Sequence, residues 1–538
     1  MISLPRHLAG SEPRLAMRPQ QREASTRQRG DVGHRRERLA LPAILLLALA
    51  LRLIAASVPS VHHPDEVFQY LEAAHRLVFG YGIVPWEYHV GIRNWLFPLI
   101  LAAPMALGGW LAPGGTLYLA LPKALMLALS LIVPWSGWRL GLMASRTHAL
   151  VAALVLATWS EFIYFAPHSL SENLATALLL PGAVLLAGTP GRRALALAGV
   201  LLGLAVLARF QVLPIAGVLA LFAGKTDVRR WLMLAAGGCV ALAIGIAIDL
   251  ATGMVPFSWL VANIHENIVS GRAAQYGTLG MLGYVTWFEF MWSWWLIAIL
   301  PLVRFGMKRQ PALFWAATAN LVLLSLVGHK EYRFVEFTAV AYILLAAIGT
   351  VDAIALIRRR WPTVSRQGAF AAAALLWLAA SASIATTEPM RANIGRATAT
   401  LAATDLLRTD ADACGIALLP DLVEWGGYAH LHRPLPINYF DANDPALAGL
   451  TPTQALRRWA PTYNRIIAVP RLTAALPPGY VRGQCFAEAG KPGPAICVYA
   501  RPGGCADASA SPFLLQKVFD RSDQQLREIA RRAARRLS

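Results

Sequence analysis

The chain has 538 residues, of which 56% are hydrophobic and only 15% charged, and its mean hydropathy is +0.48. Soluble globular domains carry about 25% charged residues. Apolar runs of about 20 residues, the length that crosses a bilayer, recur along most of this chain, so an ordinary soluble protein is excluded. The net charge of +19 would suit a nucleic-acid-binding protein, but no such motif accompanies it, and the positive charge gathers between apolar runs.

The first 39 residues form a basic segment, with nine Arg, no Lys and four acidic residues. Its basic region is too long for a cleavable signal peptide, and no small-residue cleavage site follows the first apolar run. We therefore expect residues 1–39 to be a disordered cytoplasmic tail.

Apolar stretches that predict membrane spans follow from residue 40 onward. Arg139 and Arg146 favour the cytoplasmic side, which conflicts with counting both 94–112 and 116–138 as full spans. One of the early stretches is therefore expected to be re-entrant or to lie along the membrane interface. The predicted stretches are 40–58, 94–112, 116–138, 148–166, 171–187, 194–208, 211–223, 232–252, 283–303, 312–328, 334–357 and 369–386.

The later half of the chain gives a clearer topology, because basic clusters at 225–230, 304–309 and 358–360 mark the cytoplasmic side. That places 59–92, 253–282, 329–334 and everything after residue 387 outside. Cys414, Cys485, Cys497 and Cys505 all lie in this last segment, which predicts disulfides in an oxidising compartment, with the pairing left open.

The segment 388–538 is predicted to be a mixed α/β domain. Residues 414–420 and 465–470 have the pattern of buried strands, and 485–505 that of a hairpin. The tail after residue 522 predicts a basic amphipathic helix, typical of a surface or lipid-headgroup contact.

The stretch "HHPDEVFQYLEAAHRLVFGYG" at 62–82 places acidic residues where the chain leaves its first span. A helix over 65–79 would carry Asp65, Gln69, Glu72 and Arg76 on one face, toward a cavity. The alternative is that Asp65 only caps the helix and Glu66 only complements its dipole.

A second polar segment, "HKEYRF" at 329–334, is expected on the same external side. Its cations either anchor the chain at the interface or clamp a phosphate at the bilayer surface. Acids on one external loop and cations on another indicate group transfer from a phosphate-linked donor. Because most of the chain is expected to lie in the membrane, we expect this donor to be a lipid phosphate.

The segments 63–100 and 329–334 resemble the signature motifs of family-22 glycosyltransferases, the membrane mannosyltransferases of GPI-anchor and lipid-linked oligosaccharide assembly. The matching runs are HPDE-x-x-Q, G-Y-G-x-x-x-W-E-Y, I-R-x-x-L-x-P and HKE-x-x-F, in this order. Tyr332 departs from the pattern, since eukaryotic members commonly have Glu there. This difference affects the expected identity of the acceptor more than the expected class of reaction.

The resemblance implies a GT-C-type fold: an all-α polytopic catalytic domain over 40–387, with the catalytic loop at 59–92, followed here by a small external α/β domain over 388–538. It also implies an external active site and an inverting transfer of mannose from a polyprenyl-phosphate carrier. Composition and the long basic N-terminus favour a bacterial inner-membrane protein with a periplasmic site and a lipid-linked or glycan acceptor.

The site residues follow from the motifs and from the charges near them. Asp65 is the expected general base, and Glu66 orients it or the acceptor. We expect the donor phosphate to contact His329, Lys330, Arg333, Arg93 and Arg209, and the substrates to contact His63, Gln69, Glu87, Tyr88 and Glu331.

Weaker candidates surround this set. Glu172 and Asn173 either line the cavity or pair helices, Trp86 is a candidate for stacking on a sugar, and 290–295 is expected to be an aromatic belt. No cofactor is expected, and a divalent metal at His62, His63, Asp65 and Glu66 is the less favoured alternative. A secondary transporter, a non-catalytic scaffold and transfer of another sugar such as arabinose stay open.

Overall fold

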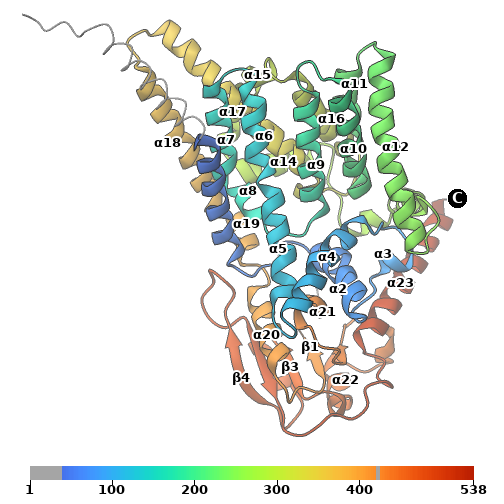
Figure 1. Cartoon of the computed structure of the whole chain (residues 1–538). Helices are drawn as coiled ribbons and strands as arrows, with labels where there is room; N and C mark the ends of the chain where they lie inside the picture. The colour runs from blue at the N-terminus through green and yellow to red at the C-terminus, as the bar shows by residue number, and fades with distance from the viewer. Residues whose placement is uncertain (1–38, 420–424, 538) are drawn as a thin grey trace, which may run out of the picture.

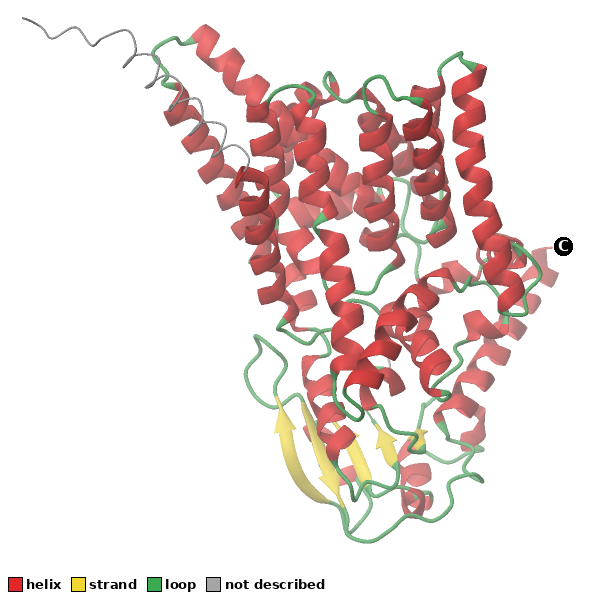
Figure 2. Cartoon of the chain, viewed as in Figure 1, coloured by secondary structure: helices red, strands yellow, loops and turns green. Residues whose placement is uncertain are grey.

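The computed structural model describes residues 39–419 and 425–537. A bundle of long helices makes up most of the molecule, and a smaller domain with a β-sheet lies at one end of it (Figures 1 and 2). The predicted disordered tail falls almost wholly outside the described residues.

The helices of the bundle follow the predicted spans closely. Five are long and apolar enough to cross a membrane, or six if the bent pair α14 and α15 counts as one span. The pair is bent by 109° at 293–294, where Ser293 takes a positive φ and ends α14, so the apolar stretch predicted over 283–303 forms two helices rather than one continuous helix. The bundle comprises Leu39–Ala56, α5 (Leu117–Ser130), α6 (Ile132–Leu142), α7 (Arg146–Thr158), α8 (Ser160–Phe165), α9 (Ser171–Leu186), α10 (Arg192–Ala208), α11 (Leu213–Gly224), α12 (Val228–Ala251), α14 (Gly283–Trp292), α15 (Trp295–Met307), α16 (Pro311–Ser325), α17 (Glu336–Arg360) and α18 (Arg366–Ala385).

Helix α4 (Leu96–Leu111) resolves the conflict in the early spans. It packs against α2 (Glu72–Phe79) and lies at the sheet end of the bundle, whereas α5 and α6 run from that end to the other (Figure 1). The stretch 94–112 is therefore the one that does not run the length of the bundle, and the turn between α6 and α7, which carries Arg139 and Arg146, lies at the end with the other basic turns.

Helix α17 is the most buried of the long helices, and it fixes the position of the "HKEYRF" segment before it. Glycines allow α15 and α17 to touch backbone to backbone: a Cβ on Gly306 would lie 2.0 Å from the Leu345 carbonyl oxygen, and one on Gly349 would lie 2.0 Å from that of Leu302. The short 3-10 turn η5 (Tyr332–Val335) leads directly into this rigid helix.

The predicted helix over 65–79 is present, but its first part is a π-helix, η1 (Glu66–Leu71), which continues into α2. The wider π turns rotate later residues relative to an α-helix. As a result Asp65 and Gln69 line a cavity, while Glu72 points into the C-terminal domain instead. The single polar face predicted for Asp65, Gln69, Glu72 and Arg76 is therefore wrong, because only the first two line the cavity.

The C-terminal region holds a five-stranded mixed sheet of order β2-β1-β3-β5-β4, which confirms the predicted α/β character. Parallel pairs join β1 to β2 and β3, and antiparallel pairs join β5 to β3 and β4. The predicted disulfides are present as Cys414–Cys505 and Cys485–Cys497. The strands are β1 (Ile416–Leu418), β2 (Ile437–Tyr439), β3 (Arg465–Ala468), β4 (Val481–Phe486) and β5 (Ile496–Ala500), and the main helices are α19 (Glu388–Gly395), α20 (Thr398–Thr409), α21 (Gly427–Leu431), α22 (Pro452–Arg458) and α23 (Leu515–Leu537).

Helix α21 docks the sheet domain onto α2. The fully buried Glu72 carboxylate accepts the backbone N–H of Ala429 at 2.7 Å and that of Ile83 at 2.9 Å, and the Tyr118 hydroxyl donates to the Ala429 carbonyl at 2.7 Å. Burial raises the pKa of Glu72 to about 7, although these N–H groups oppose the rise. The docking is therefore polar and buried, and it fixes the sheet domain against the external loop.

Gly427 is the tightest point of this contact, so we expect Gly427→Ala to weaken the docking. Its φ is +71°, and a Cβ would lie 2.1 Å from the Glu72 Oε1 atom. Gly449 has a φ of +89°, and a Cβ there would meet no atom of the described residues within 4 Å, so it is the matched control for backbone strain alone. We expect Gly427→Ala to lower the free energy of unfolding by about 1–3 kcal/mol more than Gly449→Ala, measured by thermal unfolding; equal losses would contradict the contact.

Candidate functional site

A large cavity of about 1110 Å³ lies where the sheet domain meets the bundle. It is lined from both external polar segments, from α11, α14 and α16, and from α19 and α23 of the C-terminal region. Among the described residues that line it are all the predicted site residues except Glu66 and Tyr88: His63, Asp65, Gln69, Glu87, Arg93, Arg209, His329, Lys330, Glu331 and Arg333.

The two external polar segments meet at an ion pair between Asp65 and Arg333. The Arg333 Nη2 atom donates to Asp65 Oδ2 at 2.6 Å, across 268 residues of sequence. Asp65 stands at the N-cap of η1, yet within the described structure its side chain accepts no capping hydrogen bond. Burial alone would raise the pKa of Asp65, but the charges of Arg333 and His63 outweigh it and hold the pKa well below its ordinary value. The Asp65 side chain therefore does not serve as a helix cap, which was the alternative interpretation of its position.

Glu331 extends the pair into a small charged network. Its carboxylate accepts from Arg333 Nε at 2.7 Å, lies 2.9 Å from His329 Nε2, and lies 3.3 Å from His63 Nε2. Burial would raise the pKa of Glu331, but Arg333 and the two histidines lower it far more. The hydrogen bond to Glu331 in turn raises the pKa of His329.

Arg333 is only 3% exposed and also faces Glu172 on α9. Its Nη1 atom lies 3.1 Å from Glu172 Oε1, and Arg209 Nη1 reaches the same oxygen at 3.1 Å. Glu172 is therefore shared by two buried guanidinium groups, which answers the question left by the sequence: it pairs the helices behind the cavity.

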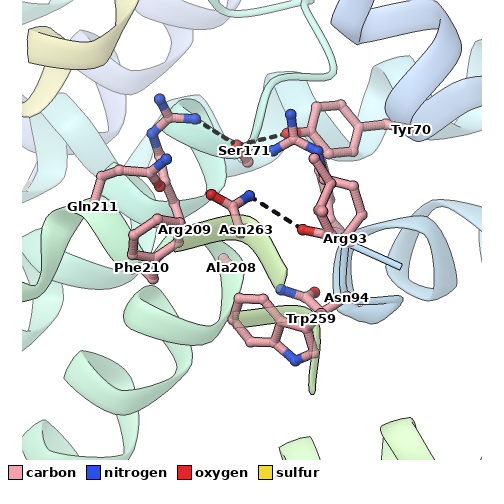
Figure 3. Close-up of a pocket in the computed structure, with 12 residues that line it drawn as sticks. Tyr70, Arg93, Asn94, Ser171, Ala208, Arg209, Phe210, Gln211, Trp259 and Asn263 are labelled. Carbon is pink, nitrogen blue, oxygen red and sulfur yellow. Dashed lines mark hydrogen bonds between the residues drawn. The ribbon is translucent and has the colours of Figure 1, made fainter. Parts of the chain in front are cut away.

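Beside this cluster, a pocket of about 30 Å³ adjoins the large cavity through Arg93 and Arg209. Figure 3 shows Arg209 and Tyr70 meeting at the Ser171 hydroxyl, at 3.2 Å and 2.8 Å, with Arg93 beside Tyr70. The buried Nε atoms of Arg93 and Arg209 have no hydrogen-bond partner in the part of the chain that the structure describes. Both arginines thus keep N–H donors available for an anion.

Lys330 lines the cavity but uses its ammonium to tie two external segments together. Its Nζ atom donates to the carbonyl oxygen of Leu279 at 3.0 Å and to that of Val327. An ammonium group has three donors, so Lys330 brings a positive charge to the wall and retains one N–H beyond these two bonds.

Glu66 and Tyr88 support the site from behind. The Glu66 carboxylate lies 2.9 Å from His168 Nδ1 and accepts backbone N–H groups from Ser169 at 2.9 Å and His62 at 3.1 Å. Burial would raise the pKa of Glu66, but these contacts lower it. Tyr88 donates to the Gln69 carbonyl at 2.6 Å, so both residues hold the π-helix that presents Asp65 and Gln69.

Sequence reasoning missed Arg272 and Asp523, which form an ion pair at the cavity wall although 251 residues separate them. Arg272 is 2% exposed, and its guanidinium lies over Trp86, with Cζ 3.5 Å from the ring centroid. The only sequence signal for either residue was its place in a segment expected outside the membrane.

One wall of the cavity is apolar and lies at the level of the bundle. Its side chains come from α11, α14 and the end of α16, and two of them, Leu213 and Phe290, are at least half exposed. The lining residues on this side are Leu213, Pro214, Tyr284, Trp287, Phe290, Met291, Leu324 and Val327.

The geometry of the described residues does not form a metal site: no group of three or more His, Cys, Asp or Glu side chains among them converges on one point. His62 instead lies 2.9 Å from the Tyr164 hydroxyl, and Glu66 is engaged by His168.

Comparison with known proteins relates this chain to a family. Residues 43–407 match the Alg9-like mannosyltransferase family. GPI mannosyltransferase 3 of Drosophila melanogaster is 28% identical over 340 residues, which cover 54% of this chain and 53% of that protein. GPI mannosyltransferase 3 of Yarrowia lipolytica is 24% identical over 416 residues, covering 75% and 77%. The chain thus spans about half the length of the Drosophila relative.

Among solved structures, ArnT from Cupriavidus metallidurans bound to undecaprenyl phosphate has a similar fold. The TM-score is 0.57 at 12% identity, covering 85% of this chain and 97% of that one. This similarity confirms the predicted GT-C-type fold, with its bundle of apolar helices and a small mixed sheet in the C-terminal region.

Proposed function

Since the chain belongs to the Alg9-like mannosyltransferase family, we propose that it transfers mannose from a polyprenyl-phosphate carrier to a lipid-linked or glycan acceptor, with inversion at the sugar carbon. The observation that carries this proposal is the ion pair between Asp65 and Arg333 at the cavity wall. It brings a base for the acceptor and a cation for the leaving phosphate to one point.

Asp65 is the general base of the proposed reaction. An acceptor hydroxyl oxygen attacks C1 of the mannose while the bond from C1 to the phosphate oxygen breaks, and the phosphate leaves with the bonding electrons. The hydroxyl proton passes to Asp65, and a single displacement through an oxocarbenium-like transition state inverts C1. Donor phosphate that binds Arg333 competes with Asp65 for the guanidinium, which raises the pKa of Asp65 toward its ordinary value and makes it a better base.

The cationic part of the cavity supports the assignment of the phosphate. Arg209 and Arg93 keep free N–H donors, Arg333 lies against Asp65, and His329 and Lys330 add charge at the rim. Cations fixed where negative charge develops stabilise the leaving group with little reorganisation. The apolar wall of α11, α14 and α16 begins at this end and fits the hydrocarbon chain of a polyprenyl carrier.

Charge distribution supports an orientation with this cavity on the periplasmic face of a bacterial inner membrane. The basic turns at 225–230, 304–309 and 358–360 lie at the opposite end of the bundle from the sheet domain (Figure 1), and such turns face the cytoplasm. The two disulfides at the sheet end suit an oxidising compartment.

The test is transfer from synthetic polyprenyl-phosphate-[14C]mannose by the purified full chain, with a lipid extract of the source cells as acceptor. We expect label to enter the extract, and the anomer of the new linkage to be opposite to that of the donor. Consumption of a different polyprenyl-phosphate sugar in place of the mannose donor would overturn the sugar assignment. A chain that turns over no such donor would overturn the proposed function.

A further inference from the structure

We call four of the residues that line the cavity the acceptor wall: Gln69, Trp86, Arg272 and Asp523. They come from η1, α3 (Trp86–His89), the external segment 253–282 and α23, and all four line the cavity. Arg272 stacks on Trp86, its Nη2 atom donates to Asp523, and its Nη1 atom lies 3.7 Å from Glu266 Oε2.

Two side chains of this wall carry buried polar atoms that are not satisfied. Within the described residues, Nε and Nη1 of Arg272 and Oε1 of Gln69 have no hydrogen-bond partner. Arg272 is 2% exposed and Gln69 is 3% exposed. A buried polar atom without a partner is costly, and both residues line the cavity, so unpaired N–H donors and a carbonyl acceptor in its wall indicate a polar ligand.

The charges around these atoms argue for a neutral ligand. Asp523 neutralises Arg272, and Glu87 lies beside Gln69, whose Nε2 atom donates to Glu87 Oε1 at 3.0 Å. At Arg272 a phosphate would meet Asp523 and Glu266, whereas Arg209 and Arg333 lie together at Glu172. A sugar hydroxyl both donates and accepts, so a glycan can satisfy Gln69 and Arg272 together.

We propose that the acceptor wall binds the hydroxyl groups of a glycan acceptor, with Gln69 and Arg272 as contact residues and Asp523 as the residue that positions Arg272. The proposal rests on the proposed function, because it assigns the second substrate of the same cavity. It gives the C-terminal region a defined role: helix α23 completes the acceptor end of the site.

The attachment of α23 supports this role. The Gln516 side chain accepts the backbone N–H of Val84 at 2.8 Å and donates to its carbonyl at 3.0 Å, and Phe519 packs against Phe68 with ring centroids 5.5 Å apart. The helix is therefore fixed to the loop that carries Trp86, so that Asp523 reaches Arg272 from a rigid base.

The test measures binding without turnover. The full chain is placed in lipid nanodiscs, because maltoside detergents would offer competing sugars, and is titrated with octyl-linked mannobiose and, separately, with undecaprenyl phosphate. We expect Arg272→Lys and Asp523→Asn to weaken mannobioside binding by about 10-fold or more and to leave undecaprenyl phosphate binding within about 2-fold of wild type. Arg458→Lys, an exposed change on α22, should alter neither affinity.

Gln69→Met is the second variant, since it keeps the length of the side chain and leaves the Arg272–Asp523 pair in place. It too should weaken only the mannobioside. The inference is overturned if wild type does not bind the mannobioside, if these variants bind it normally, or if Arg272→Lys weakens undecaprenyl phosphate instead. Because no transfer is required, absence of mannose transfer would count against the proposed function alone.

Discussion

Asp65→Asn is expected to reduce the rate of mannose transfer by about 10²- to 10⁴-fold, the usual loss when a general base is removed. Asparagine keeps the size of the side chain but cannot take the acceptor proton. The measurement is the initial rate of label transfer by purified protein at saturating donor. Binding of undecaprenyl phosphate should persist, because Arg93, Arg209 and Arg333 are unchanged.

Two further variants distinguish the loss of the general base from a loss of folding stability. Asp405→Asn alters an exposed carboxylate paired only with Arg408 nearby, and it should transfer at the wild-type rate. Glu66→Gln disturbs the support behind η1, so its main expected effect is a lower thermal stability. If Asp65→Asn transfers as fast as Asp405→Asn, Asp65 is not the base.

The pH dependence gives a further check on Asp65. The pKa of Asp65 is held below that of an ordinary aspartate. The carboxylate therefore stays ionised when the pH falls through the ordinary aspartate pKa. The stabilisation from its ion pair is lost only when the pH falls through the lowered pKa of the folded protein. In the enzyme without donor, Asp65 should therefore stay ionised between about pH 5 and about pH 8. We expect its protonation to cause no change in the transfer rate across this range. A loss of activity on the acid side within this window would have to come from another group.

Arg333→Met is expected to have the second large effect, on stability as well as on activity. It leaves Asp65 and Glu331 without their guanidinium partner and leaves Glu172 with Arg209 alone. Removing one partner of a buried ion pair typically costs about 3–5 kcal/mol. The expected results are a clearly lower unfolding temperature and transfer below detection.

The matched control is the exposed pair at the other end of the bundle, where Arg309 binds Asp352 at 2.8 Å with its side chain 46% exposed. Exposed pairs contribute about 0–1 kcal/mol, so Arg309→Met should unfold close to wild type. Equal losses for Arg333→Met and Arg309→Met would mean that the cluster at the cavity does not stabilise the fold.

The sequence predicted the parts of this protein that depend on local pattern. Apolar runs located the membrane helices, and charge placed the basic turns and the two polar segments at opposite ends of the bundle. The motifs at 63–100 and 329–334 predicted the residues that the fold brings together, as the pair of Asp65 and Arg333 illustrates. These patterns are short-range or compositional, so they can be recognised without knowledge of the tertiary structure.

What the sequence could not predict depends on contacts between distant segments or on helix geometry. The π turns of η1 direct Glu72 away from Gln69, and no spacing rule for an α-helix predicts that rotation. Arg272 and Asp523 belong to segments without a motif, and only the docking of α23 makes them neighbours. The pairing of four cysteines likewise depends on the order of strands in the sheet.

The hydrogen bonds between Gln516 and Val84, two residues 432 positions apart, also bear on when the protein becomes competent during its synthesis. The loop at 59–92 is made early, and in the proposed orientation it reaches the periplasmic side while the ribosome is still translating the bundle. The helix that closes its cavity is made long afterwards and must first be exported and folded. A nascent chain with every motif already in place therefore still has an open cavity, and the newborn protein is expected to bind its lipid carrier before it can hold an acceptor.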